Sequence, residues 1–515
     1  MFKTCSFHFA FIAMISVLMS MGSYACESDT NKQDKGSDGD LQENIEEDFE
    51  FEQEQEADLL TALYGHLVPN SEMNVHDRLG VATHMDQGVG DNADRNFELA
   101  TYKNLGGFRI REDFSWSSIE SSKGQWNFEG LDTQLALTRE NNVKMIALLD
   151  YGVGWAQPDG TPNSIDPADF ANFAANVAER YCKDIKDYEI WNEENIVRFW
   201  APEPNPDHYT ELLKASYAAI KQVCPDARVL FGGMASINID QYMGKRWWFI
   251  EEAGLAHPDI CSYFDVLGLH PYTYGQASSP EQDYELTATL PMQSQTEMVR
   301  IAREKLRQLG CSDKPLWFTE MGWPTYDLGE ETVARFLSRS VLLSLKDDIQ
   351  GYYWYDFYDG EPITSGMRPH ENYFGLFGWP GDQTNPRKEK PAFTSYKAIN
   401  TLLGNSYFAR DLSTTLALPD DVYVLAFVDP VNAVILALWD GRENPDGKFS
   451  DNFPNNPDTN YKLDLPLPEW TTNIVRYDQD GQTLETVEKT GDSLPMTLTA
   501  KVQYLSIGTI PLPSH

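Results

Sequence analysis

Short apolar runs alternate with longer amphipathic stretches over most of the chain. Eight such runs lie between Arg78 and Gly360, and in order they read RLGVATHM, GGFRIREDF, VKMIALLDYG, DYEIWNEEN, ARVLFGGMAS, FDVLGLHPY, KPLWFTEMGW and GYYWYDFYDG. The stretches between them, such as DPADFANFAANVAERYC and HYTELLKASYAAIKQVC, have the apolar spacing that is typical of helices packed on one side. Strands that alternate with helices form parallel sheets, and eight repeats predict closure into a (β/α)8 barrel. An open doubly wound sheet is the alternative, but no glycine-rich phosphate-binding loop follows the first run.

The pattern changes after the predicted helix AFTSYKAINTLLG, which ends at Gly404. From Asn405 onward, apolar and polar residues alternate over short segments such as DVYVLAFVD, NAVILALWDG, NIVRYD and KVQYLSIG. Loops rich in Asp, Asn, Pro and Gly separate these segments, and such alternation predicts short strands. We therefore expect a barrel domain over residues 73–404, followed by a small antiparallel β-sandwich over residues 405–515.

The N-terminal segment has the pattern of an export signal. Lys3 precedes an apolar segment over residues 7–19, and the tripeptide SYA just before Cys26 is typical of a cleavage site. The apolar segment is short for a membrane-spanning helix, which needs about 20 residues. Cys26 itself resembles the cysteine that carries the lipid in bacterial lipoproteins. We expect a signal peptide over residues 1–25 and an exported protein, either secreted or anchored at the bacterial cell surface or outer membrane through a lipid on Cys26.

Residues 26–72 are rich in Asp, Glu, Gln and Ser. Between Glu27 and Asp58 there are 14 acidic residues but only two lysines. A segment of this composition buries too little apolar surface to offset the entropy lost on folding, so we expect a disordered linker. The whole chain has 40 basic and 79 acidic residues and a formal net charge of −39. Because such a surface would repel a phosphate backbone, the composition argues against nucleic acid as a partner.

Four cysteines fall outside the signal segment, namely Cys182, Cys224, Cys261 and Cys311. Each comes shortly before a predicted strand, from the fourth to the seventh, which places all four at the N-terminal face of the barrel. The chemistry of this fold takes place at the opposite face. Since an exported protein can oxidise its cysteines, Cys182–Cys224 and Cys261–Cys311 are candidate disulfides. Four separate buried thiols are the alternative, and no Cys or His cluster has the spacing of a zinc site.

Polar side chains at the C-terminal ends of the barrel strands point into one shared pocket. In chain order these ends supply Arg109 and Arg111, Asp150 and Tyr151, Asn192 and Glu193, His270 and Tyr272, Glu320, and Trp354 and Asp356. Glu193 and Glu320 come from the fourth and seventh strands, on roughly opposite sides of the barrel mouth. Cleavage of a glycosidic bond requires one carboxyl group that protonates the leaving oxygen and one carboxylate across the anomeric carbon. We expect neither a cofactor nor a metal.

These residues resemble those of a known group of enzymes. WNE at the end of the fourth strand and TEMGWP at the end of the seventh are similar to the retaining glycoside hydrolases of clan A, which share a (β/α)8 barrel with glutamates on these two strands. IREDFSWSSIESSKGQWNF, LLDYGVGWAQ and HPYTY most resemble family 39 and its relatives. The resemblance covers about residues 78–404. It departs at WNEEN, where the family typically has Pro after the first Glu and this chain has Glu194.

The resemblance implies a role for each candidate residue. Glu193 would be the general acid/base, and Glu320 would be the nucleophile that forms a covalent glycosyl-enzyme. Arg111 would keep Glu320 ionised, Tyr272 would hold it in orientation, and Asn192 would bind the sugar 2-hydroxyl. The remaining substrate-binding candidates are His270, Trp354 and Trp200.

The sequence therefore predicts a retaining β-glycoside hydrolase that acts on a polysaccharide or oligosaccharide by double displacement. Aromatic residues follow several of the strands, which favours an extended carbohydrate cleft and internal cleavage of a glycan chain. An exo-acting, β-xylosidase-like enzyme and a non-catalytic carbohydrate-binding protein are the alternatives. A retaining mechanism predicts that the carboxyl groups of Glu193 and Glu320 lie about 5–5.5 Å apart.

Overall fold

The computed structural model describes residues 58–85, 92–105, 109–235, 248–273, 279–281, 284–287, 290–362, 369–442, 460–471, 473–489 and 491–510. These residues all belong to one compact unit. The predicted signal peptide, the lipidation candidate Cys26 and the linker as far as residue 57 lie outside the described residues.

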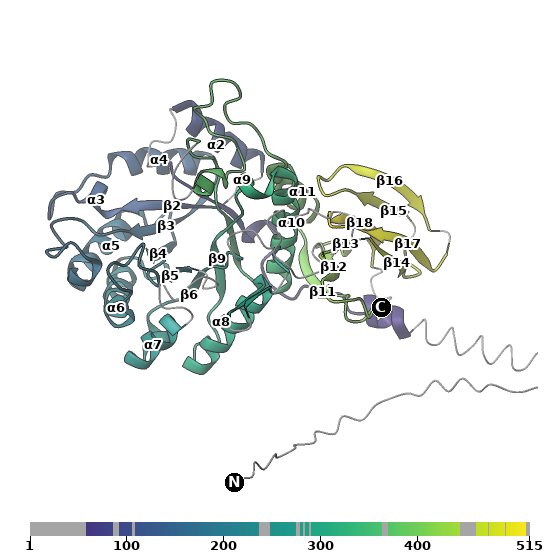
Figure 1. The fold of residues 1–515 in the computed structure, drawn as a ribbon, viewed down its shortest axis with the longest axis horizontal. Helices are drawn as coiled ribbons and strands as arrows, with labels where there is room; N and C mark the ends of the chain where they lie inside the picture. The colour runs from purple at the N-terminus through teal and green to yellow at the C-terminus, as the bar shows by residue number, and fades with distance from the viewer. Residues whose placement is uncertain are drawn as a thin grey trace, which may run out of the picture. The chain divides into compact units, whose positions relative to one another are not determined.

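Eight parallel strands close into a barrel, as the sequence predicts (Figure 1). Each of the eight apolar runs contains one strand. The strands are β1 (Leu79–Thr83), β2 (Arg109–Ser115), β3 (Lys144–Asp150), β4 (Asp187–Asn192), β5 (Arg228–Ala235), β6 (Val266–His270), β9 (Leu316–Met321) and β10 (Gly351–Trp354). Sequence neighbours pair with each other around the barrel, and β10 pairs with β1 to close it. Because both faces of such strands are covered, they read as nearly continuous apolar segments.

Helices connect the barrel strands and lie outside them (Figure 1). They are α2 (Asn92–Asn104), α3 (Trp116–Ile119), α4 (Glu129–Glu140), α5 (Pro167–Tyr181), α6 (Pro206–Val223), α7 (Trp248–Ala256), α8 (Gln295–Leu309), α9 (Thr325–Leu328), α10 (Glu330–Lys346) and α11 (Pro391–Leu403). A hairpin of β7 (Tyr284–Thr287) and β8 (Leu290–Met292) lies between β6 and α8 in the chain. Short 3-10 turns occupy His76–Arg78, Pro162–Ser164, Ile260–Ser262 and Pro369–Tyr373.

Helices α5 and α6 begin where the sequence supplies a cap. The side chain of Asp166 accepts a hydrogen bond from the N–H of Ala168 at the start of α5, and Asn205 does the same for His208 at the start of α6. Proline is the first helical residue in both cases, where its missing N–H costs nothing. These signals fix where each of the two helices begins.

Side chains fill the barrel interior, so it is a packed core without a pore. One interior layer consists of Ile146, Leu230, Val266, Trp317 and Tyr353, which come from five different strands and are at most 1% exposed. The guanidinium of Arg109 lies 5.8 Å from the centre of the Trp317 ring and 3.9 Å from Asp187, the first residue of β4. Arg109 therefore pairs with an acidic neighbour at the N-terminal end of the strands, away from the mouth.

The C-terminal part is antiparallel, as predicted. Its strands are β11 (Tyr407–Asp411), β12 (Val422–Val428), β13 (Ala433–Asp440), β14 (Tyr461–Pro466), β15 (Asn473–Tyr477), β16 (Thr483–Glu488), β17 (Ser493–Leu498) and β18 (Gln503–Thr509). Six of them form a sheet in the order β11-β12-β13-β18-β15-β16, and β14 pairs with β17. The predicted boundary after residue 404 falls in the turn between α11 and β11.

The large sheet of this part is covered on both faces. Along β12, Val424 and Ala426 belong to the core of the β domain, while Leu425 and Phe427 between them join the core that contains the barrel residues. Alternate side chains of a strand point to opposite faces, so one face of the sheet packs within the β domain and the other against the barrel domain. This explains why the segment reads as an unbroken apolar run.

The predicted linker is wrong at its C-terminal end, because residues 58–64 form a helix. Leu63, Tyr64 and Leu67 are at most 5% exposed and belong to the core of the β domain. The hydroxyl of Tyr64 also donates a hydrogen bond to the backbone oxygen of Pro466 at 2.9 Å. Leu60, which packs against the same core, precedes Leu63 and Tyr64 by three and four positions. This is the helical signal that the acidic composition of the preceding residues obscured.

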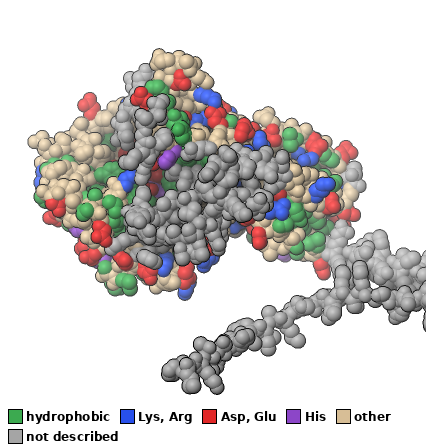
Figure 2. All heavy atoms as spheres, viewed as in Figure 1, with side chains coloured by type: hydrophobic (Ala, Val, Ile, Leu, Met, Phe, Trp, Pro, Cys, Tyr) green, Lys and Arg blue, Asp and Glu red, His purple; other side chains and the backbone are tan. Residues whose placement is uncertain are grey.

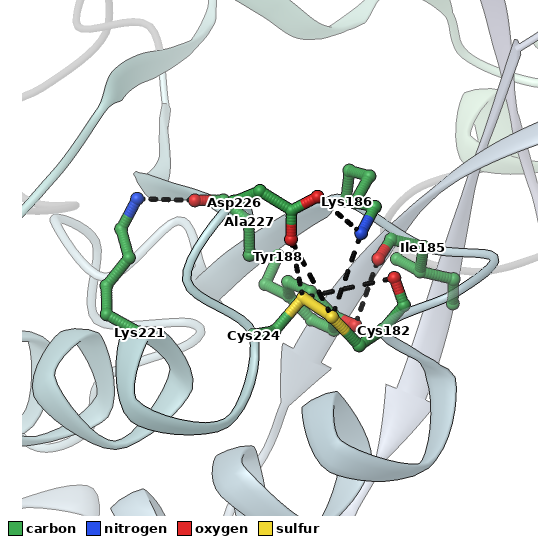
Figure 3. Close-up of a disulfide and its surroundings, with 8 residues drawn as sticks. All are labelled: Cys182, Ile185, Lys186, Tyr188, Lys221, Cys224, Asp226 and Ala227. Atoms are coloured by element: carbon green, nitrogen blue, oxygen red, sulfur yellow. Dashed lines mark hydrogen bonds and ion pairs between the residues drawn. A yellow bond between two sulfur atoms is a disulfide. The ribbon is translucent and has the colours of Figure 1, made fainter.

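Two disulfides join the predicted cysteine pairs. Cys182 bonds to Cys224 and Cys261 to Cys311, with sequence separations of 42 and 50 residues. Figure 3 shows the first bond next to the ion pair of Lys186 and Asp226, whose charged atoms are 2.7 Å apart. Every cysteine precedes a strand, so both bonds lie at the N-terminal face of the barrel.

Replacing both Cys182 and Cys224 with Ala is expected to lower the free energy of unfolding by about 2–4 kcal/mol, because the bond closes a loop of 42 residues in the unfolded chain. Denaturant unfolding of the variant and the oxidised wild type measures this difference. Catalytic activity at temperatures where the variant is folded should be unchanged, since the bond lies at the face opposite the strand ends. A variant that is folded but inactive would contradict the conclusion that the disulfide is remote from the residues that act at the strand ends.

The described surface carries charges of both signs. Figure 2 shows acidic side chains scattered over one face of the molecule with basic side chains between them. No helix in the described part of the chain combines the length and apolarity needed to cross a membrane.

Candidate active site

Arg111 lies at the mouth of the barrel and binds three polar side chains. It belongs to β2, and its side chain is only 4% exposed. Its Nε donates a hydrogen bond to Glu189 at 2.6 Å, and its Nη1 donates to Glu320 at 2.7 Å. Its Nη2 donates to the amide oxygen of Asn192 at 2.9 Å. One guanidinium therefore ties β2 to β4 and β9, and its charge offsets two buried carboxylates.

Glu320 is the last but one residue of β9 and accepts hydrogen bonds at both carboxylate oxygens. Arg111 donates to Oε1, and the hydroxyl of Tyr272 donates to Oε2 at 2.9 Å. The two donors hold the carboxyl group in one orientation. The structure thus brings Arg111 and Tyr272 to the positions that the resemblance implies. The Glu320 side chain keeps 12% of its surface exposed at the mouth.

Glu193 lies close to Glu320 but has a different partner. Its Oε1 is 3.0 Å from Nδ1 of His270, and its side chain is 13% exposed. One oxygen of Glu193, one oxygen of Glu320 and a ring nitrogen of His270 all lie within 4.8 Å of one another. Retaining glycosidases hold their two carboxyl groups about 5–5.5 Å apart, whereas inverting enzymes hold them about 6.5–9.5 Å apart. The close approach fits the retaining geometry.

An unusual backbone at the end of β4 aims these side chains. Trp191 and Glu193 have φ angles of 70° and 48°, in the left-handed region that bulky residues rarely adopt. In a regular strand, residues three positions apart point to opposite faces. Here Glu189 and Asn192 both reach Arg111, because the left-handed residue Trp191 breaks the alternation. Strain of this kind persists where the surrounding structure enforces it, often at functional sites.

Two site residues were missed by the sequence reasoning. Glu189 is fully buried in the barrel, where it binds Arg111 and accepts a hydrogen bond from the hydroxyl of Thr319 at 2.8 Å. Thr319 is also fully buried, and its Oγ1 lies 3.1 Å from Nε2 of His270. The sequence did contain a signal for Glu189, because it is a charged residue in the middle of an apolar strand. A buried carboxylate requires a partner, so such a position indicates a polar contact inside the barrel.

The consecutive glycines of β5 make room for two of these side chains. A Cβ atom on Gly233 would lie 2.0 Å from Nε2 of His270, and one on Gly232 would lie 2.3 Å from Oε2 of Glu194. No side chain fits at either position without displacing the neighbour. The FGGMAS segment therefore has glycine at both positions because His270 and Glu194 occupy the space that a side chain would need.

Three predicted substrate contacts are corrected by burial. Trp200, Trp354 and His270 have no exposed surface. The indole N–H of Trp200 donates to Asn163 at 2.8 Å, and that of Trp354 donates to the backbone oxygen of Phe374 at 3.1 Å. Both rings pack among other aromatic side chains, so neither presents a face to a sugar in this structure. His270 lies beneath Glu193 and Glu320 in the barrel. Because its ring has no exposed surface, it cannot contact a substrate directly.

Tyr151 is the aromatic residue that reaches the surface beside the site. It follows β3, is 36% exposed and accepts a hydrogen bond from the amide of Asn192 at 2.9 Å. Its ring stacks on Phe199, with centroids 5.6 Å apart and planes inclined by 10°. Phe199 is half-buried, so Tyr151 is the more accessible ring of the stacked pair.

A second charged cluster lies at the ends of β1, β2 and β10. Nδ1 of His84 is 3.1 Å from Asp113, and its Nε2 is 3.3 Å from Asp356. Burial lowers the pKa of His84, but the charge of Asp356 and hydrogen bonds to both carboxylates raise it well above its usual value. The imidazole is therefore charged near neutral pH, and Asp356 has a structural partner.

Glu194, where the chain departs from the family pattern, is buried behind the site. It has no exposed surface, and neither of its carboxyl oxygens has a hydrogen-bond partner among the described residues. Burial raises the pKa of Glu194 well above its usual value, and the charges of Glu189 and Glu193 add to this effect. We therefore expect Glu194 to be protonated at neutral pH.

Replacing Glu194 with Gln is expected to stabilise the protein more at pH 8 than at pH 5. In the unfolded chain this group ionises near its ordinary pKa of about 4.3, whereas burial keeps it protonated in the folded protein. The folded state then binds the extra proton, so the wild type loses stability as the pH rises from the unfolded toward the folded pKa. Thermal unfolding at both pH values measures the effect. An equal difference in Tm at the two pH values would show that Glu194 does not titrate on unfolding.

The comparisons with known proteins agree with this geometry. No known protein-family model matches the chain. A beta-xylosidase from Geobacillus stearothermophilus is 26% identical over 236 residues, which are 44% of this chain and 42% of that protein. The chain thus matches less than half the length of this curated relative.

Solved structures with the same fold cover more of the chain. A family 39 glycoside hydrolase from Bacteroides cellulosilyticus aligns with a TM-score of 0.65 at 21% identity, over 85% of this chain and 82% of the other. A monomeric beta-xylosidase from Caulobacter crescentus aligns with a TM-score of 0.60 at 15% identity, over 86% of this chain and 98% of the other. The predicted barrel fold and the predicted resemblance to a family 39 glycoside hydrolase are confirmed.

Proposed function

We propose that the chain is a retaining β-glycoside hydrolase, with Glu193 as the acid/base and Glu320 as the nucleophile. The approach of these two side chains to within 4.8 Å at the barrel mouth is the observation that carries the proposal. Their different partners support separate roles. Arg111 and Tyr272 donate hydrogen bonds to Glu320, whereas Glu193 lies against His270. The relatives named above support the same class of reaction.

The arrangement fits a double displacement. The ionised Glu320 attacks the anomeric carbon while the proton of Glu193 passes to the leaving oxygen, so the glycosidic bond breaks as the glycosyl-enzyme forms. A water molecule then gives a proton to Glu193, and its oxygen attacks the anomeric carbon and releases Glu320. Each step inverts the anomeric carbon, and the product therefore keeps the β configuration. In this mechanism Asn192, which hydrogen-bonds to Arg111 and Tyr151, would bind the sugar hydroxyl next to the anomeric carbon.

The mode of cleavage has two candidates. The sequence favours internal cleavage of a glycan chain, and the exposed ring of Tyr151 beside the site supports a cleft that continues past the cleaved bond. The two relatives named as beta-xylosidases support instead the release of single xylosyl units from chain ends. We take β-linked xylosyl chains as the first substrates to test for both modes.

Product sizing separates these candidates. Wild type, Glu320→Gln and the exposed-site control Glu304→Gln on α8 are incubated with a panel of β-linked glycans, and the products are separated by length. A ladder of oligosaccharides supports internal cleavage, and monosaccharides alone support action at chain ends. Equal activity of Glu320→Gln and wild type would reject the mechanism, and activity on no glycan or aryl glycoside would leave the binding-protein alternative.

We also propose that the protein is exported and carries a lipid on Cys26. The signal-like segment and the two disulfides support export, because such bonds persist mainly in oxidising compartments. In a bacterial host, Cys26→Ser is expected to move the protein from the membrane fraction to the soluble fraction. Equal membrane association of both proteins would contradict lipidation.

A further inference from the structure

Both ring nitrogens of His270 have polar partners, although the ring is fully buried beneath the two glutamates. Nδ1 lies 3.0 Å from Oε1 of Glu193 and 3.5 Å from Oε2 of Glu320, and Nε2 lies 3.1 Å from Oγ1 of Thr319. A neutral imidazole has one nitrogen that donates and one that accepts. The position of its single proton therefore decides the direction of both hydrogen bonds.

The partners of Thr319 determine that position. Its hydroxyl has one proton, which it donates to Oε1 of Glu189 at 2.8 Å. Glu189 is paired with Arg111 at 2.6 Å, and a carboxylate only accepts hydrogen bonds. The oxygen of Thr319 is left to accept a hydrogen bond from His270. The proton of the imidazole is therefore on Nε2, and Nδ1 faces Glu193 with a bare lone pair.

If both ring nitrogens carried protons, Nδ1 would donate a hydrogen bond to Glu193 and this conclusion would not hold. Burial disfavours that charged form of the imidazole. Burial lowers the pKa of His270 to about 4; the charge of Arg111 acts in the same direction, and the charges of Glu320 and Glu189 oppose it. His270 is therefore neutral at neutral pH. Among the described residues, five titratable or charged groups act on the ring, Glu194 or Tyr272. They lie on β2, β4 and β9 and in the segments that follow β4 and β6, and they are Arg111, Glu189, Glu194, Tyr272 and Glu320.

We infer that His270 is a positioning residue that holds the catalytic proton on Glu193, because its bare Nδ1 can bond to that carboxyl group only when the group is protonated. The inference rests on the proposed function and deepens it. Two carboxyl groups this close cannot both be ionised without a cost. Arg111 and Tyr272 stabilise the charge on Glu320, and His270 stabilises the proton on its neighbour.

The same lone pair acts in both half-reactions. When Glu193 gives its proton to the leaving oxygen, its new negative charge faces the electron pair of Nδ1 at 3.0 Å. That repulsion makes the carboxylate a stronger base, so it favours removal of a proton from the incoming water. The proton returns to Glu193, and His270 remains neutral throughout the cycle.

Nuclear magnetic resonance of protein labelled with ¹⁵N-histidine tests the protonation state directly. The signals of His270 are identified by their loss in His270→Asn, or by their shift in Thr319→Val if the first variant does not fold. We expect a neutral ring with the proton on Nε2 throughout the range from about pH 5 to pH 8, where an ordinary histidine titrates. A proton on Nδ1, or a doubly protonated ring, would overturn the inference.

Kinetics of Thr319→Val test the consequence for catalysis. Valine keeps the shape of the side chain but removes the hydroxyl that orients His270. For β-glycosides with poor leaving groups, which require protonation, kcat/KM should fall at least about 10-fold, and the alkaline limb of the pH profile should move to lower pH. For a dinitrophenyl glycoside, which needs no acid, kcat/KM should change less than about 2-fold. The control Thr210→Val removes a buried hydroxyl that is bonded to the backbone of α6 and should match wild type with both substrates.

These outcomes distinguish the inference from the proposed function. An equal loss on both substrates would mean that Thr319 acts only in packing, and the inference would be rejected while the hydrolase remains. If wild type hydrolyses no aryl glycoside, or if Glu320→Gln is as active as wild type, the proposed function itself fails. The protonation state of His270 is measurable in either case.

Discussion

Replacing Glu320 with Gln is expected to lower kcat/KM for an aryl β-glycoside by at least about 10⁴-fold, because an amide cannot form the covalent glycosyl-enzyme. The fold should survive. Glutamine has nearly the same shape as glutamate, and its amide oxygen can still accept a hydrogen bond from Arg111 or Tyr272. Activity assays together with thermal unfolding separate loss of the nucleophile from loss of structure.

The matched control is Glu304→Gln on α8, which makes the same change at an exposed carboxylate paired with Arg307. It should be as active as wild type. Glu193→Gln gives a second comparison, since loss of the acid should affect substrates with poor leaving groups far more than activated ones. A Glu320→Gln protein that is folded and retains more than a few per cent of wild-type activity would contradict the assignment of the nucleophile.

Replacing Arg111 with Met is expected to destabilise the protein by about 3–5 kcal/mol and to abolish activity. The guanidinium is 4% exposed and bonds to Glu189 and Glu320, so its removal leaves two buried carboxylates without a compensating charge. Glu320 would also lose the hydrogen bond that Arg111 donates to its Oε1, and with it the contact that orients the carboxylate. Denaturant unfolding measures the loss of stability, and assays at low temperature measure the activity of the folded fraction.

Arg300→Met on α8 is the control for this change. Arg300 makes a comparable pair with Glu297, but its side chain is 65% exposed and water can replace the lost contacts. Little change in stability is expected there. If Arg111→Met were as stable as Arg300→Met, the charge of Arg111 would not be needed to balance the buried carboxylates, and the proposed role of the guanidinium would be wrong.

The barrel could be predicted because its signal is repeated and local. Each strand is a short apolar run, and the polar residues that follow it are brought to the mouth by the topology alone. For this reason Glu193 and Glu320, which are far apart in the sequence, could be paired before any coordinates were known. The cysteine pairs followed in the same way, because each cysteine comes before a strand.

What the sequence could not predict depends on side-chain packing. Trp200 follows β4 and Trp354 ends β10, where a sugar platform is expected, but both rings are fully buried among other aromatic side chains. Glu189 joins the site only because the left-handed backbone of Trp191 lets two residues three positions apart reach Arg111. The direction of the hydrogen bond between His270 and Glu193 depends on the contacts of Thr319 and Glu189, and no sequence pattern predicts those contacts.

Trapping of the glycosyl-enzyme is the most direct test of the central claim that Glu193 and Glu320 act together in a retaining hydrolase. An activated β-glycoside whose 2-hydroxyl is replaced by fluorine forms the covalent intermediate faster than water can remove it. Mass spectrometry of the digested protein should find one sugar on the peptide that contains Glu320, and none in Glu320→Gln. A sugar on a different carboxylate, or turnover that gives a product of inverted configuration with no adduct, would contradict the account.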